Sequence, residues 1–389
     1  MPKHSPLIEA ACPTSNLLLI SRSMPSNKNQ HFVPRCYLGA FSGDTAGAAI
    51  NLFNIDRSCA IRNAPLKGQC SKSYFYGEDL HLEKALQTFE GAYAAMLREI
   101  VQPGYHLTAA HGQELKEFWC LQHLRTEASA RRSVVAAERM IDDIGLRDDT
   151  YRLTMRESVE ASVSMLPIIS QGISDLKACL VKNVTNLPFV TSDDPAISAN
   201  RWHQQDIRAK GVAPGLGSAG ALLFLPMTPN ILALLYDSNV YSIRRLHGWA
   251  SIDSISDIAA FNEHQYLNAF ANIYFHDWHT KNVVEQEFLN LASNRPADRH
   301  RFHYAVWDRI EDGAEVFREV SAAEAREHER SIVHQEAIYP VPTRWPRLIC
   351  FRTDGHVWFN GSGAGYTRQA TIPPTSNDYK KYPSRRGRL

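Results

Sequence analysis

The apolar pattern of the 389-residue chain changes near residue 186, and this change constrains the fold more than any other feature of the sequence. Before residue 186, apolar side chains recur every three or four residues, which is the spacing of one helix face, in the segments 79–101, 108–145 and 150–180. After it, short apolar runs separated by Pro, Asn and Gly follow at 187–198, 220–229 and 230–238. Such runs are typical of buried strands and their turns. The sequence therefore predicts an α+β fold in which a central bundle of long helices packs against a mixed or antiparallel β-sheet.

Residues that start or stop helices set the expected limits of these segments. Pro103 and Gly104 should end the first helix. Thr108 is the expected N-cap of the second helix and Gly145 its expected C-terminal stop. The third helix contains Pro167, which should kink it or split it in two.

Smaller elements are expected towards both ends of the chain. Apolar residues in the segments 32–38 and 50–57 predict a small N-terminal β-hairpin region. Helical spacing returns in the segments 254–277 and 282–292. The C-terminal part predicts a strand at 303–309, a charged helix at 322–337 and a hairpin at 347–361 with Asp354-Gly355 at its tip.

These elements group into four regions. Residues 1–28 are expected to be a disordered leader, or an artefact of an upstream start if Met24 rather than Met1 begins the protein. Residues 29–294 form the expected core domain. The segment 295–375 is expected to be a C-terminal appendage of helix and hairpin, followed by a basic, flexible tail at 376–389.

Composition excludes some classes of protein. The chain has 42 Lys and Arg against 41 Asp and Glu, so no overall positive field attracts nucleic acid or a membrane surface. No apolar run reaches eighteen residues, which argues against a membrane span. Seven cysteines without a C-x-x-C pair indicate reduced thiols, and therefore a cytoplasmic location.

Two polar residues interrupt the apolar face of the second helix. Gln122 and Arg125 lie at helical spacing with Leu115 and Phe118, in a stripe that should be core. A buried arginine without a partner is costly, so Arg125 must meet a carboxylate, a phosphate or another ligand. The choice between a structural ion pair and a ligand stays open at this point.

Other candidate residues lie on the elements before and after this helix. His31 precedes an apolar stretch, and Pro34 favours an extended backbone around it. Glu83 and Glu90 are two turns apart on the first helix, at the border of its apolar stripe. The three side chains would form a metal or general-base site if the N-terminal strands fold back onto that helix, and are otherwise a structural histidine and two solvated glutamates.

The segment "FVTSDDPA" brings hydroxyl and carboxylate groups to the end of an expected strand. Ser192, Asp193 and Asp194 lie there, and Pro195 keeps the turn extended. Strand ends on a rigid sheet are common places for binding sites, although the same residues are also ordinary turn formers.

The blocks "QHFVPRCYLGAF", "SYFYGED", "FWCLQHLRT", "FVTSDDPAI" and "LLFLPMTPNILALLYD" resemble, in order and spacing, the bacterial family called domain of unknown function 4238. The resemblance covers about residues 29–291. It implies no activity, but members usually read Asp-Asn-Pro where this chain has Asp193-Asp194-Pro195. The polar positions that the resemblance marks as shared are His31, Glu83, Glu90, Gln122, Arg125, Ser192, Asp193 and Pro195.

Two functional hypotheses follow. The first is a metal-dependent hydrolase that cuts a phosphodiester, such as a nuclease-like toxin or defence effector acting on nucleic acid or a nucleotide. Its expected catalytic residues are His31, Glu83, Glu90 and Asp193, with the three carboxylates holding Mg²⁺ or Mn²⁺. Its expected substrate-binding residues are Gln122, Arg125, Ser192 and Asp194.

The alternative hypothesis is a non-catalytic binding or sensor module. In this interpretation the same His, Glu, Gln, Arg and Asp residues form a buried network that fixes the packing of helices on the sheet, or a site for a small anion. The sequence has no Gly-rich phosphate loop, no H-E-x-x-H and no G-x-S-x-G. These absences argue against an ATP-hydrolysing enzyme, a zincin protease and an α/β-hydrolase, respectively.

Overall fold

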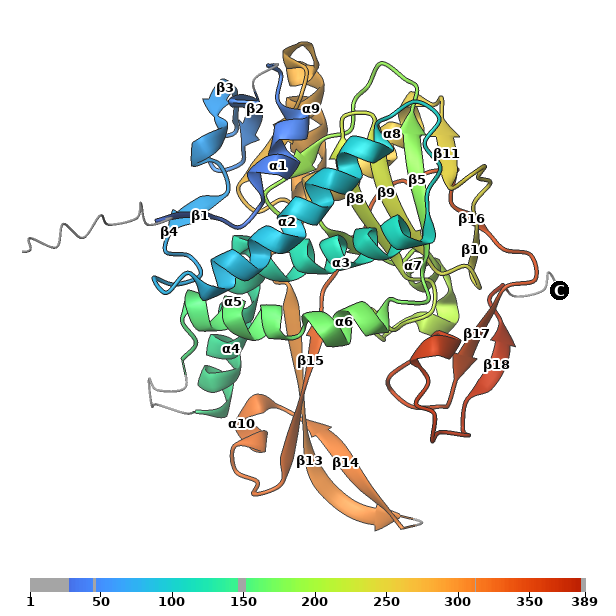
Figure 1. The fold of residues 1–389 in the computed structure, drawn as a ribbon. Coiled ribbons are helices and arrows are strands. Elements are labelled where there is room, and N and C mark those ends of the chain that lie inside the picture. The colour runs from blue at the N-terminus through green and yellow to red at the C-terminus, as the bar shows by residue number, and fades with distance from the viewer. Residues whose placement is uncertain (1–27, 45–46, 146–151, 312, 386–389) are drawn as a thin grey trace, which may run out of the picture.

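The structure is a computed structural model that describes residues 28–44, 47–145, 152–311 and 313–385. It confirms the α+β class, with helices on both faces of a central sheet (Figure 1). The helices are α1 (Arg35–Leu38), α2 (His81–Ile100), α3 (Ala109–Arg125), α4 (Glu127–Ile144), α5 (Met155–Ser164), α6 (Leu166–Gly172), α7 (Arg201–Gln205), α8 (Ile255–Asn268), α9 (Lys281–Leu291) and α10 (Ala322–Ala325).

The central sheet has five strands in the order β11-β5-β9-β8-β7. Only β11 and β5 run parallel, so the sheet is mixed, as expected. Its strands are β5 (Lys177–Asn183), β7 (Ile197–Ala199), β8 (Leu222–Thr228), β9 (Ile231–Tyr236) and β11 (Trp249–Ile252). Each of the three apolar runs after residue 186 contributes at least one strand to this sheet or to the four-stranded sheet described next.

A second, four-stranded sheet has the order β3-β2-β12-β6 and lies beside the first. It contains β2 (Ala49–Asn54), β3 (Cys59–Pro65), β6 (Thr191–Ser192) and β12 (Asn272–Phe275). The antiparallel pairing of β2 with β3 confirms the expected N-terminal hairpin region for the segment 50–57. The segment 32–38, also expected to contribute to it, is not a strand, because Arg35–Leu38 forms α1. The remaining strands are β1 (Asn29–His31), β4 (Ser71–Ser73), β10 (Tyr241–Ser242), β13 (His300–Glu311), β14 (Ala314–Val320), β15 (Ser331–Ala337), β16 (Cys350–Phe351), β17 (His356–Phe359) and β18 (Lys380–Pro383).

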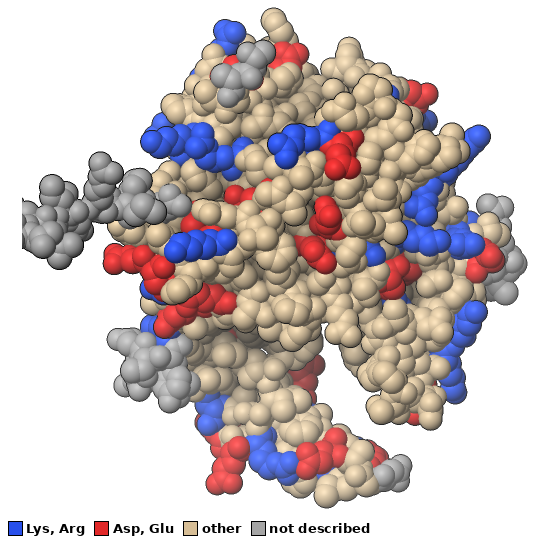
Figure 2. Space-filling view, viewed as in Figure 1, with Lys and Arg blue, Asp and Glu red and all other residues tan. Residues whose placement is uncertain are grey.

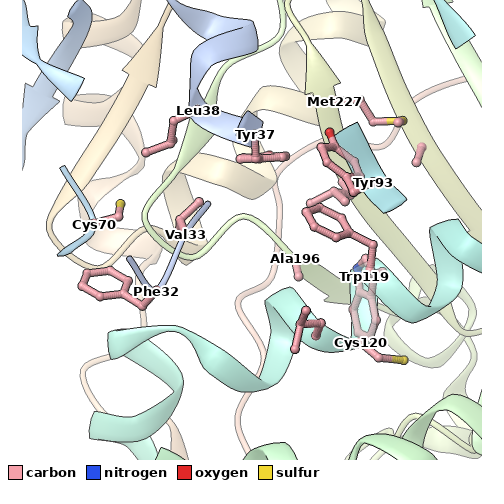
Figure 3. Close-up of a cluster of buried hydrophobic side chains, with 14 of the residues drawn as sticks. Phe32, Val33, Tyr37, Leu38, Cys70, Tyr93, Trp119, Cys120, Ala196 and Met227 are labelled. Atoms are coloured by element: carbon pink, nitrogen blue, oxygen red, sulfur yellow. The ribbon is translucent and has the colours of Figure 1, made fainter. Parts of the chain in front are cut away.

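The period of two along the strands directs side chains into two cores. On β8, Leu223 and Leu225 face the apolar cluster that includes residues of α2 and α3, whereas Leu222 and Phe224 face the cluster that includes α8. Figure 3 shows the first of these clusters, where Tyr93 and Trp119 from the helices pack near Tyr37 and Met227. Both faces of the central sheet are therefore covered.

The expected single helix at 108–145 is wrong, because the chain breaks at Thr126. This residue has an extended backbone (φ −73°, ψ 155°), ends α3 and begins α4. Its hydroxyl accepts the backbone N–H of Ser129, as an N-cap does, and donates to Asp194. The predicted limits, Thr108 as N-cap and Gly145 as left-handed C-cap, are confirmed.

Two other helix predictions extend into strands. The described part of the expected helix at 150–180 contains α5 and α6, which adjoin near Pro167 as predicted, but the chain from Lys177 onwards is strand β5. Likewise, helical spacing was expected to continue to residue 277, yet α8 ends at Asn268 and β12 follows. In each case the sheet supplies backbone partners that a local pattern does not show.

The C-terminal part also differs from the prediction. Strands β14, β13 and β15 form a three-stranded antiparallel sheet that projects from the body (Figure 1), and β15 occupies much of the expected charged helix. The expected hairpin around Asp354-Gly355 is not formed, because β16 pairs with β10 and β17 pairs with β18.

Much of the expected appendage is packed into the main body. Ile349, Val357 and Tyr366 belong to the same apolar cluster as Phe224 on the central sheet. Part of the expected flexible tail is ordered, since Lys380–Pro383 is strand β18. The expected leader, apart from residue 28, lies outside the described residues. In the described part of the chain, none of the helices is long and apolar enough to span a bilayer.

Candidate functional site

Arg125, at the end of α3, is fully enclosed by protein groups. Its side chain is 1% exposed. Its Nη1 donates to Glu90 Oε1 at 2.8 Å, Nε to the Tyr76 hydroxyl at 2.9 Å and Nη2 to the His31 carbonyl at 2.6 Å. Of the partners that the sequence left open, the structure therefore supplies a carboxylate of the chain itself.

His31 and Glu83 lie beside this arginine. The His31 ring is 3.1 Å from the Lys67 carbonyl, and burial lowers the pKa of His31, so the ring is neutral at pH 7. Glu83 is partly buried, and burial together with the charge of Glu90 raises its pKa. We call His31, Tyr76, Glu83, Glu90 and Arg125 the Arg125 cluster.

The side chains of Asp193 and Ser192, at the end of β6, form hydrogen bonds with α8 and with the turn that follows it. The Asp193 carboxylate accepts the backbone N–H groups of Phe270, Ala271 and Asn272 at 2.8, 2.6 and 3.1 Å. Ser192 donates to Gln265 Oε1 at 2.7 Å. Burial raises the pKa of Asp193 to about 7, even though the three N–H groups act in the opposite direction.

Asp194 is compensated by a cation. Its carboxylate accepts from Arg132 Nη1 at 2.5 Å, from the Thr126 hydroxyl at 2.9 Å and from Asn268 Nδ2 at 3.0 Å. Burial acts to raise the pKa of Asp194, but the charge and hydrogen bonds of Arg132 outweigh it and hold the pKa below its usual value. The Asp194 carboxylate is thus paired with Arg132 on α4.

The residues expected to hold a metal ion do not come together. Glu83 and Glu90 lie near Arg125, whereas Asp193 is bound to the α8–β12 turn. Among the described residues, no group of three or more His, Cys, Asp or Glu side chains is arranged to hold a metal ion. Gln122, expected to bind substrate, is fully buried, and neither atom of its amide has a hydrogen-bond partner in the described part of the chain.

The sequence prediction missed a pocket next to Asp194. It has a volume of about 630 Å³ and lies between α4, the end of α8 and the segment that leads into β13. We call it the arginine pocket, because its lining includes five arginines: Arg131, Arg132, Arg139, Arg295 and Arg299. Of the described residues, two acidic ones, Glu138 and Asp298, line it. On the molecular face shown in Figure 2, by contrast, charges of both signs are interspersed.

Arg295 and Arg299 carry the excess charge of this pocket. Both are partly buried, and each donates to a backbone carbonyl at the end of α8, Arg295 to Ala269 and Arg299 to Leu267. Neither forms an ion pair with a described residue. Burial lowers the pKa of Arg295, and burial and the nearby charge of Arg132 lower the pKa of Arg299 to about 10. The charges of Asp193 and Asp56 attract Arg295 and that of Asp194 attracts Arg299, but none of these carboxylates forms an ion pair with either arginine. The site therefore holds two guanidinium groups without an ion-pair partner among the described residues.

A smaller pocket of about 190 Å³ shares Arg132, Asn268, Arg299 and His300 with the arginine pocket. We call it the polar pocket, and the other polar side chains that line it are His123, Ser129, Ser133, Ser198 and Tyr339. Burial, aided by Arg132, lowers the pKa of His123 to about 4, which keeps this ring neutral.

His300 offers a hydrogen-bond donor in these pockets. Burial and the charges of Arg132 and Arg299 lower the pKa of His300, so its ring is neutral at pH 7. Its Nδ1 lies 2.7 Å from Gln335 Nε2, which can only donate, so the ring proton is on Nε2. That Nε2 is buried and has no hydrogen-bond partner among the described residues.

A signal for the arginine pocket exists in the sequence, but it is weak. Arg132 and Arg139 are seven residues apart on one helix, and Arg295 and Arg299 follow at a spacing of four. The net charge of +1 conceals this concentration. Nothing local shows that the two segments meet.

The fold and these sites define an α+β protein with an internally satisfied Arg125 cluster and a separate, basic pocket. The sequence profile described as protein of unknown function DUF4238 matches residues 29–279, and the chain belongs to this family. The match confirms the resemblance and ends twelve residues before the expected limit. No curated protein and no solved structure matches the chain. Arg295, Arg299 and His300 lie beyond the matched segment.

Proposed function

We propose that this protein is a binding module that holds a phosphate-bearing anion in the arginine pocket. The observation that carries the proposal is the pair Arg295 and Arg299, which are partly buried beside Arg132 and have no ion pair with a described residue. Partly buried cations without a carboxylate in direct contact are costly for a protein to maintain. A bound anion would remove that cost.

The chemistry of the lining favours phosphate. Guanidinium groups bind phosphate oxygens through paired hydrogen bonds and keep their charge at neutral pH. The neutral His300 ring adds an N–H donor. A volume of about 630 Å³ is within the range of small-molecule sites, whose volumes are roughly 300–1,000 Å³.

The geometry supports the hydrolase hypothesis less well. Glu90 is paired with Arg125, and both oxygens of Asp193 accept backbone N–H groups. These contacts fit the alternative interpretation, a buried network that fixes packing, next to a site for an anion. Hydrolysis with Mg²⁺ or Mn²⁺ and a cytoplasmic location stay predictions from the sequence.

Calorimetric titration with inorganic pyrophosphate tests the proposal. The parent protein should bind pyrophosphate, and Arg299→Gln should weaken binding at least about tenfold, since a hydrogen bond to a charged group contributes roughly 1.5–3 kcal/mol. Arg309→Gln is the matched control, because Arg309 is 55% exposed on the projecting sheet and pairs with Asp308 and Glu311. Equal affinity of all three proteins, or no binding by the parent, would contradict the proposed function.

A further inference from the structure

The arginine pocket has an apolar side that a bare phosphate would leave unused. Phe270 lines the pocket and is 43% exposed, and Val135 lines it and is 59% exposed. Phe302 and Met155 complete this side. Exposed apolar side chains gathered within a pocket are typical of a surface that contacts a ligand. The ligand should therefore carry an apolar or aromatic part in addition to its charge.

The two phenylalanines are each paired with an arginine. The guanidinium carbon of Arg131 lies 5.4 Å from the ring centre of Phe270, and that of Arg139 lies 5.9 Å from the ring centre of Phe302. Aromatic rings and guanidinium planes are the surfaces on which proteins stack nucleobases. An aliphatic chain would gain nothing from the two guanidinium planes.

The polar pocket supplies a place for the charged end of such a ligand. Arg132, Arg299 and His300 line both pockets, so they lie where the two meet. The polar pocket is small, and Ser129 and Ser133 add hydroxyl groups to it. A flat ring in the larger pocket and a phosphate at the junction would together use both parts of the site.

We propose that the ligand is a nucleoside phosphate, with its base against Phe270 and Phe302 and its phosphate held by Arg132, Arg299 and His300. This inference rests on the proposed function and specifies the ligand class. The same unit occurs as a free nucleotide and as the 5′-phosphorylated end of a strand. No covalent step is involved.

Calorimetry with five probes tests the inference. The probes are AMP, GMP, CMP and UMP, with ribose 5-phosphate as the matched ligand that lacks a base. At least one nucleotide should bind about tenfold or more tightly than ribose 5-phosphate, the size expected when one stacked base is added. If no nucleotide binds more tightly than ribose 5-phosphate, the inference is overturned while the proposed function stands. If neither these probes nor pyrophosphate bind, the proposed function fails as well.

The variant Phe270→Leu separates the base contact from the phosphate contact. It should remove most of the advantage of the nucleotide and leave the affinity for ribose 5-phosphate unchanged, whereas Arg299→Gln should weaken both. Leu246→Ala is the control, because Leu246 is an apolar side chain that is 72% exposed and does not line the arginine pocket. An unchanged nucleotide advantage in Phe270→Leu would contradict the stacking contact.

Saturation-transfer NMR on the parent protein needs no variant. Base protons of the bound nucleotide should receive more saturation from the protein than ribose protons do, and the reverse order would overturn the inference. A 5′-phosphorylated trinucleotide distinguishes the two sources of the ligand. Tighter binding than the mononucleotide supports a strand end, and equal or weaker binding supports a free nucleotide.

Discussion

The Arg125 cluster and the arginine pocket contain the same chemical groups but differ in how their charges are balanced. Arg125 gives its hydrogen bonds to Glu90, to Tyr76 and to the His31 carbonyl. Arg295 and Arg299 donate hydrogen bonds to backbone carbonyls within the described chain and form no ion pair there. The contacts of the first arginine are structural, whereas the proposed function assigns the other two to a bound anion. What distinguishes a structural arginine from a binding one is its set of partners, not its burial alone.

The largest predicted effect on the free energy of unfolding concerns Asp193, which has hydrogen bonds but no ion pair with a described residue. Because burial raises its pKa to about 7 from an ordinary 3.8, the folded protein keeps this proton between about pH 4 and pH 7 while the unfolded chain releases it. The stabilisation from this proton is complete below about pH 4 and is lost as the pH rises through 7. The contribution of Asp193 to the free energy of unfolding should fall by about 1.4 kcal/mol for each pH unit in this range.

Unfolding by urea across this pH range checks the prediction. Asp193→Asn cannot titrate, so the free energy of unfolding of the parent, minus that of the variant, should fall by about 4 kcal/mol from pH 4 to pH 7. A difference that stays constant with pH would show that the three backbone N–H groups keep Asp193 ionised throughout.

Glu90→Gln tests the balanced charge of the Arg125 cluster. The substitution leaves the guanidinium of Arg125 buried without its carboxylate, so the free energy of unfolding should fall by about 3 kcal/mol. Glu99→Gln on the same helix is the control, since Glu99 is 65% exposed, and its effect should be within about 0.5 kcal/mol. Similar melting of the two variants would show that the ion pair is not structural.

Asp194→Asn tests the ion pair that lies between the two regions. It removes the charge partner of Arg132, and the free energy of unfolding should fall by about 2 kcal/mol because Arg132 is only partly exposed. Release of Arg132 should also strengthen pyrophosphate binding, by about threefold or more. If calorimetry shows weaker pyrophosphate binding in this variant, Arg132 does not contribute to the anion site.

Arg299→Gln should have the smallest effect on stability. Burial and the nearby charge of Arg132 both disfavour the charged form of Arg299. Removing this charge should therefore change the free energy of unfolding by less than about 1 kcal/mol. Pyrophosphate binding should weaken at least about tenfold in the same variant. A large loss of stability, seen in urea unfolding without ligand, would place Arg299 with Arg125 among the structural arginines.

The sequence was informative where spacing alone decides the structure. The α+β class, the helix limits at Thr108 and Gly145 and the split near Pro167 follow from periodicity and from residues with strong backbone preferences. The burial of Arg125 followed from its place in an apolar stripe. The particular partner, Glu90, lies 35 residues away and is set by how two helices pack.

Non-local contacts explain the failures. The break at Thr126 depends on Asp194, which lies 68 residues further along the chain. Strands β5 and β12 override helical spacing because each lies between two other strands in its sheet. Two hydrogen-bonded neighbours stabilise a strand more than a short periodic pattern stabilises a helix.

The sequence by itself determined the fold class, the family and the burial of Gln122 and Arg125, because these depend on local spacing and on the cost of unpaired charge. Only the tertiary structure decided which charges neutralise each other. It paired Arg125 with Glu90 and Arg132 with Asp194, and it brought Arg295 and Arg299 to the end of α8. Electrostatic energy depends on distances in space, and the order of residues along the chain does not fix those distances.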